Sequence, residues 1–303
     1  MRVLRDLTPS DKKTAVALGY FDGIHLGHKA VIGKAVDAKK SGLVPAAFTF
    51  SSTPKSKDKN SQLLTYKEKL GIFEKLGIEI LYILDFEQLK DYSPEDFVKK
   101  IIAKVFNAEE VFCGFNYRFG KLGAGSTDEL NKLCEKENIK VGICTPVELD
   151  GDLVCSTEIR NALKNGDIKK ANRFLGYDFG LKSEVIKGNN IGSKIDTPTI
   201  NQKFENGIIL PKFGVYASVV TIGNERYTGV TNIGIKPTVG SRNLPNCETW
   251  MPEYKGDDLY GKTVDVRLKE FIRPERKFNS LDELKAEIIN NGKTAMELLR
   301  DTQ

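Results

Sequence analysis

The stretch TAVALGYFDGIHLGH, residues 14–28, decides the fold of the N-terminal part of this 303-residue chain. Its first residues are short and apolar, as in a buried β-strand, and apolar residues recur at helical spacing after Ile24. The glycines between these two patterns therefore lie in a strand-to-helix turn. We expect Gly19 and Gly23 to take backbone angles closed to other residues and to let the main chain approach a ligand.

Both histidines of the chain lie at the end of this stretch. His25 and His28 are one helical turn apart, so their imidazoles are predicted to face the same point. A helix N-terminus binds anions through its free N–H groups, and imidazoles with a reference pKa near ~6.5 can hydrogen-bond or carry charge there. The stretch therefore predicts a phosphate site. A structural zinc site is not expected, because the chain has no third histidine and no paired-cysteine motif.

Length and composition predict two domains with a sizeable core. Hydrophobic residues make up 40% of the sequence, charged residues 29%, and the formal net charge is +5. This small basic excess suits phosphate-bearing small molecules and does not require nucleic acid as a partner. No apolar run approaches the ~20 residues that span a bilayer, so we expect no membrane partner. The five scattered cysteines are typical of free thiols, and we expect a cytoplasmic protein.

Strand-like and helix-like patterns alternate along residues 1 to about 180. This alternation predicts an α/β fold, a doubly wound parallel sheet of the Rossmann-like kind, in which ligands bind beyond the carboxyl ends of the strands. The expected strands are 14–20, 44–50, 78–84, 109–114 and 140–144, and the expected helices are 25–40, 65–76, 94–106 and 126–138.

A glycine-rich segment, GFNYRFGKLGAGS at 114–126, follows the fourth expected strand. Asn116 supplies an amide that can read a ligand edge or a phosphate, and Arg118 supplies a fork of donors. The segment is also compatible with an ordinary glycine loop. Its position at the carboxyl end of a strand favours a site.

A second polar segment, CSTEIRNALKNG at 155–166, is predicted to form a helix. Ser156 or Thr157 is the expected N-cap and Gly166 the expected stop. Arg160 would then lie in the first turn, where hydroxyls, free N–H groups and a guanidinium together can bind a triphosphate. Taken alone, the segment is equally compatible with a capped surface helix.

From about residue 181, short β-rich runs replace the alternation. Antiparallel strands without intervening helices predict a compact antiparallel β-barrel, and SLDE at 280–283 reads as the capping box of a terminal helix. We therefore predict two domains, residues 1–180 and residues 181–303. The expected strands of the second domain are 182–187, 214–222, 226–234 and 263–271.

The motifs of the first domain resemble those of a known family. GYFDGIHLGH at 19–28 is similar to the signature of the nucleotidyltransferase half of bacterial bifunctional riboflavin kinase/FAD synthetases, or FMN adenylyltransferases. The segments at 114–126 and 155–166 resemble its other motifs, with Cys155 in place of the usual serine. The resemblance implies that His25, His28 and Arg160 are catalytic, stabilising charge around the α-phosphorus of ATP. It implies nucleotide binding by Gly19, Phe21, Asp22, Gly23, Asn116, Ser156 and Thr157.

The second domain resembles the flavokinases of the same family. TPTIN at 197–201 is similar to their PTxN motif, which implies that Thr199 and Asn201 act on the nucleotide and on Mg²⁺ through ATP. Glu248 occupies the position of the family's general base, which takes a proton from the ribityl 5′-hydroxyl of riboflavin. Further matches lie at 211–217, 229–240 and 258–261.

The second domain also departs from the family pattern. Trp250, the only tryptophan, stands where a histidine is usual, and Asp196 stands where a glycine is usual. The alternative is therefore an FAD synthetase whose second domain binds flavin or regulates without catalysis. Another small-molecule nucleotidyltransferase is a further alternative. An interaction protein that contacts RNA is disfavoured, because no RNA-binding motif is present.

The resemblance as a whole implies a bifunctional transferase of flavin cofactor biosynthesis. It would phosphorylate riboflavin to FMN in the second domain and adenylylate FMN to FAD, with release of pyrophosphate, in the first. ATP, riboflavin, FMN and FAD are the implied substrates and products, with Mg²⁺ as the cofactor. The sequence does not determine the oligomeric state.

Overall fold

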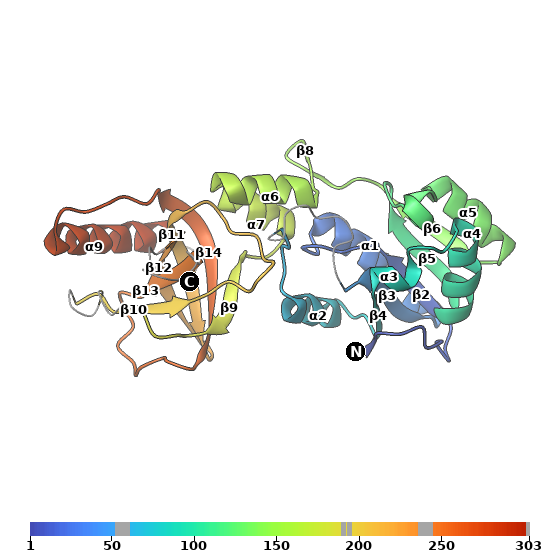
Figure 1. Cartoon of the computed structure of the whole chain (residues 1–303), viewed down its shortest axis with the longest axis horizontal. Helices are drawn as coiled ribbons and strands as arrows, with labels where there is room; N and C mark the ends of the chain where they lie inside the picture. The colour runs from blue at the N-terminus through green and yellow to red at the C-terminus, as the bar shows by residue number, and fades with distance from the viewer. Residues whose placement is uncertain (52–60, 189–191, 193–195, 236–244, 301–303) are drawn as a thin grey trace. The chain divides into compact units, whose positions relative to one another are not determined.

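The computed structural model of the chain describes residues 1–300 except 52–60, 189–191, 193–195 and 236–244. The chain divides into two compact units, Met1–Ser156 and Thr157–Gln303, whose elements are labelled in Figure 1. The domain boundary between residues 180 and 181, which the change in sequence pattern indicates, stays a prediction. The motif at 229–240 lies partly outside the described residues.

A six-stranded parallel sheet forms the centre of the first unit (Figure 1). Its strand order is β1-β4-β3-β2-β5-β6. After the edge strand β1, the chain passes from β2 through β3 to β4, and then crosses back to place β5 on the other side of β2. The carboxyl ends of β2 and β5 therefore border the point where the strand order reverses, which is where ligands bind in such sheets. The strands are β1 Arg2–Leu4, β2 Thr14–Leu18, β3 Val44–Phe50, β4 Ile80–Leu84, β5 Ala108–Gly114 and β6 Lys140–Cys144.

Helices cover both faces of this sheet, as the doubly wound prediction requires. On one face Ala15 packs with Ala38 and Leu43, and on the other Val16 packs against η2 and α5. The edge strand β1 was not expected, because three residues are too few for a periodic pattern. The helices are α1 Leu26–Asp37, η1 Ala38–Ser41, α2 Tyr66–Lys75, α3 Phe86–Leu89, α4 Pro94–Asp96, η2 Phe97–Val105, η3 Lys121–Gly123 and α5 Thr127–Lys136, and a small hairpin joins β7 Glu148–Leu149 to β8 Asp152–Leu153.

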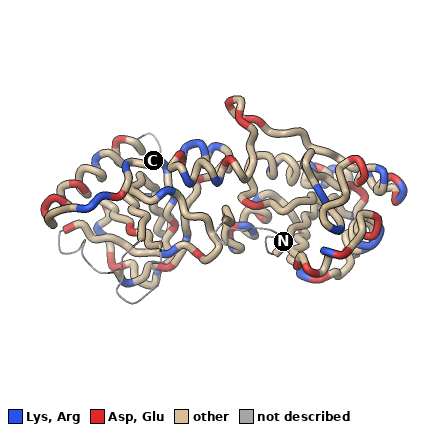
Figure 2. The backbone as a smooth tube through the Cα atoms, turned by 45° about the horizontal axis from the view of Figure 1, so that its top comes forward, with Lys and Arg blue, Asp and Glu red and all other residues tan. Residues whose placement is uncertain are grey.

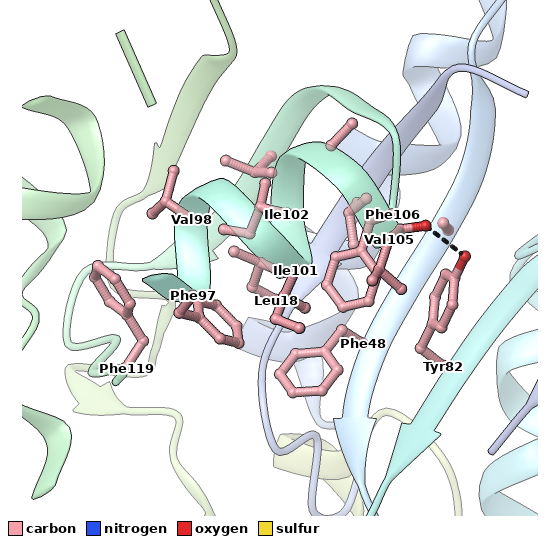
Figure 3. Close-up of a cluster of buried hydrophobic side chains, with 14 of the residues drawn as sticks. Leu18, Phe48, Tyr82, Phe97, Val98, Ile101, Ile102, Val105, Phe106 and Phe119 are labelled. Atoms are coloured by element: carbon pink, nitrogen blue, oxygen red, sulfur yellow. Dashed lines mark hydrogen bonds between the residues drawn. The ribbon is translucent and has the colours of Figure 1, made fainter. Parts of the chain in front are cut away.

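The helix expected at 94–106 is a π-helix over most of its length. Its buried apolar residues repeat every four positions, which is longer than the 3.6-residue period of an α-helix. A wider turn keeps these residues in one line, and the N–H of Phe106 accordingly bonds to the carbonyl of Ile101, five residues back. Figure 3 shows this line of side chains packed on the sheet, where the Tyr82 hydroxyl donates to the Val105 carbonyl at 3.1 Å.

The second unit is built on a six-stranded antiparallel sheet of order β10-β13-β12-β11-β14-β9 (Figure 1). The two ends of this order meet where the Ile186 N–H donates to the Asn201 carbonyl at 2.8 Å. This bridge joins the chain after β9 to β10, so the predicted antiparallel barrel is confirmed. The strands are β9 Gly180–Glu184, β10 Thr199–Gln202, β11 Gly214–Ile222, β12 Glu225–Ile235, β13 Pro245–Trp250 and β14 Thr263–Arg273.

The terminal helix α9, Leu281–Leu298, lies beside β11 and β12 and closes one face of the sheet (Figure 1). Ser280 caps it, because its hydroxyl accepts the Glu283 N–H at 3.1 Å. The reciprocal half of the expected capping box is displaced by one residue, since the Glu283 carboxylate accepts the N–H of Asn279. Two more helices, α6 Ser156–Asn165 and α7 Ile168–Leu175, precede the barrel.

Candidate active sites

The turn after β2 combines tight packing with unusual backbone angles. Gly23 has the expected left-handed angle, with φ of 83°, but Phe21 and Ile24 share that region with φ of 51° and 38°. Such angles cost an L-residue about 1–3 kcal/mol each and concentrate at functional sites. Gly19 does not take a left-handed angle, so that expectation was wrong. Glycine is needed there because a Cβ would lie 2.9 Å from the buried Phe21 ring.

The two histidines meet as predicted. His25 is the N-cap of α1, and its Nδ1 accepts the N–H of His28 at 3.3 Å. The two imidazoles stack with ring centroids 3.7 Å apart and 20° between their planes. The Phe21 ring meets His28 edge-on with centroids 5.3 Å apart, which fixes the second imidazole from its other side.

The environment of His28 favours its neutral form. Burial lowers its pKa well below the usual value of 6.5, and the charges of His25 and Lys69 lower it further. Its Nδ1 is buried and has no hydrogen-bond partner among the described residues. A polar ring atom left unsatisfied in this way is available to a ligand. The imidazole therefore offers hydrogen bonding rather than a resident positive charge.

Ser156 reaches the same turn from α6. Its hydroxyl donates to the main-chain carbonyl of Asp22 at 3.0 Å, while the Asp22 carboxylate accepts the N–H of Leu63 at 2.9 Å. Ser156 is thus the first helical residue and joins two segments of the site, in place of the N-cap role that the sequence suggested. Thr157 and Arg160 follow it on α6, and the helix ends before Gly166, whose φ of 84° fits the predicted stop.

Asn116 lies two residues beyond the end of β5, at the same edge of the sheet as the turn after β2. Its side chain is exposed, as is that of Arg118. No hydrogen bond holds the Asn116 amide among the described residues, so its donor and acceptor face solvent. This edge is where the strand order reverses, and the amide is open to a ligand there.

Sequence reasoning missed one residue of this site, Lys69 on α2. Its Nζ donates to the Tyr20 carbonyl and to the Thr49 hydroxyl, both at 2.8 Å. Burial lowers its pKa to about 8, and the carboxylate of Asp22 opposes that shift. The available signal was its spacing: Lys69 lies four residues before the buried Phe73, on the inward stripe of the helix.

The second site is a row of polar side chains across adjacent strands of the barrel. Glu248 on β13 pairs with Asn201 on β10 and with Asn232 on β12, so the three share one face of the sheet. The amide of Asn246 holds two of them, donating to Asn201 Oδ1 at 3.1 Å and to Glu248 Oε1 at 3.0 Å. Glu248 is half-buried and oriented, unlike a solvated surface carboxylate.

A cavity of about 280 Å³ lies over this face, between the barrel and α9. Small-molecule pockets commonly span roughly 300–1,000 Å³ and combine apolar walls with a few polar groups. Thr199 and Glu248 supply polar groups here, and Trp250 forms part of the wall. The remaining lining residues are Gly192, Val215, Val230, Asn232, Arg273, Glu275, Arg276, Phe278, Leu284, Ile288 and Asn291.

Known families match both units. A family model described as FAD synthetase matches residues 7–158, and one described as riboflavin kinase matches residues 175–299. A curated protein of Bacillus subtilis named bifunctional riboflavin kinase/FMN adenylyltransferase is 34% identical over 94% of this chain and 92% of its own length. One of the same name from Listeria monocytogenes is 32% identical over 92% of this chain and 90% of its own. The chain belongs to the bifunctional riboflavin kinase/FMN adenylyltransferase family.

A solved structure also resembles this family member along nearly its whole length. It is titled a macrolide-efflux protein from Streptococcus pneumoniae, has a TM-score of 0.88 and 28% sequence identity, and the match covers 97% of each chain. Within the part of our chain that the structure describes, no helix has both the length and the apolarity needed to cross a bilayer.

The two departures of this family member from the motif pattern are accommodated by its own structure. Asp196 forms an ion pair with Lys285 of α9 at 2.8 Å, so its charge is partly balanced. Trp250 lies against Gly292 of α9, where a Cβ would come within 2.6 Å of the indole. The same helix therefore supplies the cation that pairs with Asp196 and the glycine that makes room for the Trp250 ring.

Oxygen donors suited to Mg²⁺ are present at the second site. Thr199 and Asn201 lie on one face of β10 and Glu248 lies opposite on β13. The Asn201 amide is set closely against Gly188, where a Cβ would lie 2.3 Å from it. In the described residues no three His, Cys, Asp or Glu side chains gather into a metal cage. This donor set fits a hard cation that keeps waters and takes further oxygens from phosphates.

Proposed function

We propose that this chain phosphorylates riboflavin with ATP in its second unit and transfers AMP from a second ATP to FMN in its first. The observation that carries the proposal is the presence of two chemically different groups of side chains, one in each unit. One is a stacked histidine pair at the carboxyl edge of a parallel sheet, and the other is an oriented carboxylate in a pocket of an antiparallel barrel.

In the kinase step, the ribityl 5′-oxygen of riboflavin attacks the γ-phosphorus of ATP. The bond between this phosphorus and the β–γ bridging oxygen breaks, and ADP leaves with that oxygen. Glu248 takes the proton of the 5′-hydroxyl, a role that suits a carboxylate held by Asn246 at the wall of the pocket. Thr199 and Asn201 would hold Mg²⁺ with the nucleotide phosphates, where the ion supplies charge neutralisation.

In the adenylyl step, a phosphate oxygen of FMN attacks the α-phosphorus of ATP. The bond from this phosphorus to the α–β bridging oxygen breaks, giving FAD and pyrophosphate. FMN is itself the nucleophile, so the work of the protein is alignment and charge stabilisation. We assign His25 and His28 to the oxygens of the α-phosphate, and Ser156, Thr157 and Arg160 to the triphosphate.

The remaining residues of the first site bind the nucleotide in this proposal. The tight turn at Gly19, Phe21, Asp22 and Gly23 lets the main chain approach the ligand, and Asn116 reads a polar edge of it. We place the functional boundary near residue 180. We also place the protein in the cytoplasm, where reduced thiols persist, which agrees with five cysteines that are all free.

Chromatography of the flavin products tests both assignments. Wild-type protein with ATP and Mg²⁺ should give FMN and FAD from riboflavin, and FAD from FMN. His28→Ala should abolish FAD formation and spare FMN formation. Glu248→Gln should lower FMN formation by roughly 10²–10⁴-fold, as expected for loss of a general base, and spare FAD formation from FMN.

Glu253→Gln is a matched control, because Glu253 is an exposed glutamate just beyond β13. It should leave both reactions unchanged. An equal loss of both reactions in either site variant would overturn the assignment of separate sites. FAD from FMN without any FMN from riboflavin would instead make the second unit a flavin-binding module without catalysis.

A further inference from the structure

The ammonium of Lys69 lies under the turn that carries the two histidines. It bonds to the Tyr20 carbonyl and to the Thr49 hydroxyl, and it lies 5.0 Å from the centre of the Tyr20 ring. The Thr49 hydroxyl in turn donates to the Tyr20 carbonyl at 2.7 Å, and Thr49 is fully buried. The lysine is therefore held in one position, with two of its three N–H groups used.

This cation lacks a counterion among the described residues. The one carboxylate whose charge acts on Lys69 is that of Asp22, and its Oδ1 accepts the N–H of Leu63. Asp22 raises the pKa of Lys69 through space but does not form an ion pair with it. Burying an ammonium without a paired carboxylate is costly, which points to an anion that arrives with the substrate.

Lys69 also acts on the histidine pair. Its positive charge is one of the causes that lower the pKa of His28, after burial and the charge of His25. The ammonium and the unpartnered Nδ1 of His28 thus belong to one electrostatic environment. An anion bound there would be favoured by Lys69 directly and would strengthen hydrogen bonding from His28.

We propose that Lys69 carries the resident positive charge of the adenylyltransferase site, and that a phosphate group of bound ATP or FMN is the counterion that the described residues do not supply. The assignment rests on the proposed function of the first unit. It makes Lys69 a binding residue for phosphate oxygens, with its third N–H directed to the substrate, and it leaves His28 to act as a neutral hydrogen-bonding group until substrate arrives.

The test measures kcat/KM for FAD formation from FMN between pH 6 and 10, with riboflavin kinase activity of the same protein as the internal reference. Lys69→Met should lower the adenylylation value by roughly 10- to 100-fold at pH 7, the usual loss for a hydrogen bond to a charged group. Lys67→Met is the matched control, because Lys67 lies on the same helix and is exposed, and it should change neither activity.

The pH profile separates a charge from a merely structural role. In the wild type, kcat/KM for FAD formation should fall tenfold per pH unit above about 8, because Lys69 loses its proton. Lys69→Arg should remove this fall up to pH 10, because a guanidinium stays charged. Thr49→Val keeps the lysine but removes an acceptor of its hydrogen bonds, so the fall should begin at lower pH.

Separate titrations of ATP and FMN identify the phosphate concerned, because the KM of the substrate that contacts Lys69 should rise most in Lys69→Met. Wild-type activity in Lys69→Met would overturn the proposal, and so would identical pH profiles for the wild type and Thr49→Val. If Lys69→Met fails to fold, the pH profiles of the wild type and of Thr49→Val still test the proposal. A wild-type protein that makes no FAD would contradict the proposed function itself, which is a distinguishable result.

Discussion

Packing, and not backbone angle, restricts position 19 to glycine. The Phe21 ring occupies the space that a Cβ would fill, at 2.9 Å, and this ring also positions His28. We expect Gly19→Ala to destabilise the first unit by about 1–3 kcal/mol, as overpacking of a core does. It should also lower FAD formation, because the ring and the imidazole must move together.

Gly33 offers a matched control within α1. A Cβ there meets nothing within 4 Å, so Gly33→Ala should stabilise the helix by about 0.5–1 kcal/mol and leave activity unchanged. Denaturant unfolding gives both free energies. An equally stable Gly19→Ala variant would show that the turn relaxes around the added methyl group.

The fluorescence of Trp250 can report ligand binding at the second site. It is the only tryptophan and lines the cavity beneath α9, whose apolar walls suit a flat aromatic ligand. We expect riboflavin to quench its emission, and the quenching to follow the same concentration dependence as FMN formation. Riboflavin should still quench Trp250 emission in the Glu248→Gln variant, because the substitution removes the base and leaves the apolar walls of the cavity unchanged.

Free N-acetyltryptophanamide at the same absorbance controls for light that riboflavin itself absorbs. Unchanged Trp250 emission at riboflavin concentrations that saturate FMN formation would place the flavin elsewhere.

The sequence predicted most of the residues that the structure brings together at the two candidate sites, but not their physical states. His25 and His28 could be placed together because a helical turn fixes their spacing. The neutral state of His28 and the role of Lys69 depend on burial and on segments distant in the sequence, Tyr20, Thr49 and α2, which no local pattern encodes.

At the scale of elements, two short strands that carry the residues proposed for the kinase step were not predicted. β10 has only four residues, and β13 reads PNCETW, which opens with proline and asparagine and lacks alternation. Each is stabilised by its neighbours, since β13 pairs with both β10 and β12. Pairing with neighbouring strands overrides the low local β-propensity of these two segments. The long strands β11, β12 and β14 could be predicted from their own composition.

Helix α7 belongs physically to the barrel, although it precedes the predicted boundary at 180. The Asn172 amide donates to the Leu268 carbonyl and accepts the Phe179 N–H, both at 2.8 Å, and Lys169 pairs with Glu270 at 2.7 Å. We expect a fragment of residues 157–303 to be more stable than one of residues 181–303, because the shorter fragment exposes the strand face that α7 covers.

Thermal unfolding of the two fragments measures the difference, with kinase activity as the check that the barrel is native. Equal unfolding temperatures would show that α6 and α7 contribute nothing to the stability of the barrel.

At the scale of the whole molecule, charge is mixed in both units. Lys and Arg alternate with Asp and Glu along the described chain and do not form one long basic stripe (Figure 2). Phosphate binding therefore depends on individual buried or oriented cations such as Lys69. This pattern suits small phosphorylated substrates and gives the RNA alternative no support.

The histidine pair and Glu248 lie in separate compact units, which predicts that the two activities can be separated and then recombined. His28→Ala should make only FMN from riboflavin, and Glu248→Gln should make FAD only when FMN is supplied. An equimolar mixture of the two should convert riboflavin to FAD, because FMN released by one chain diffuses to the other. A lag before FAD appears should shorten as protein concentration rises, which chromatography over time measures. If the mixture makes FMN but no FAD, although Glu248→Gln converts FMN that is supplied, the FMN stays bound to the chain that made it.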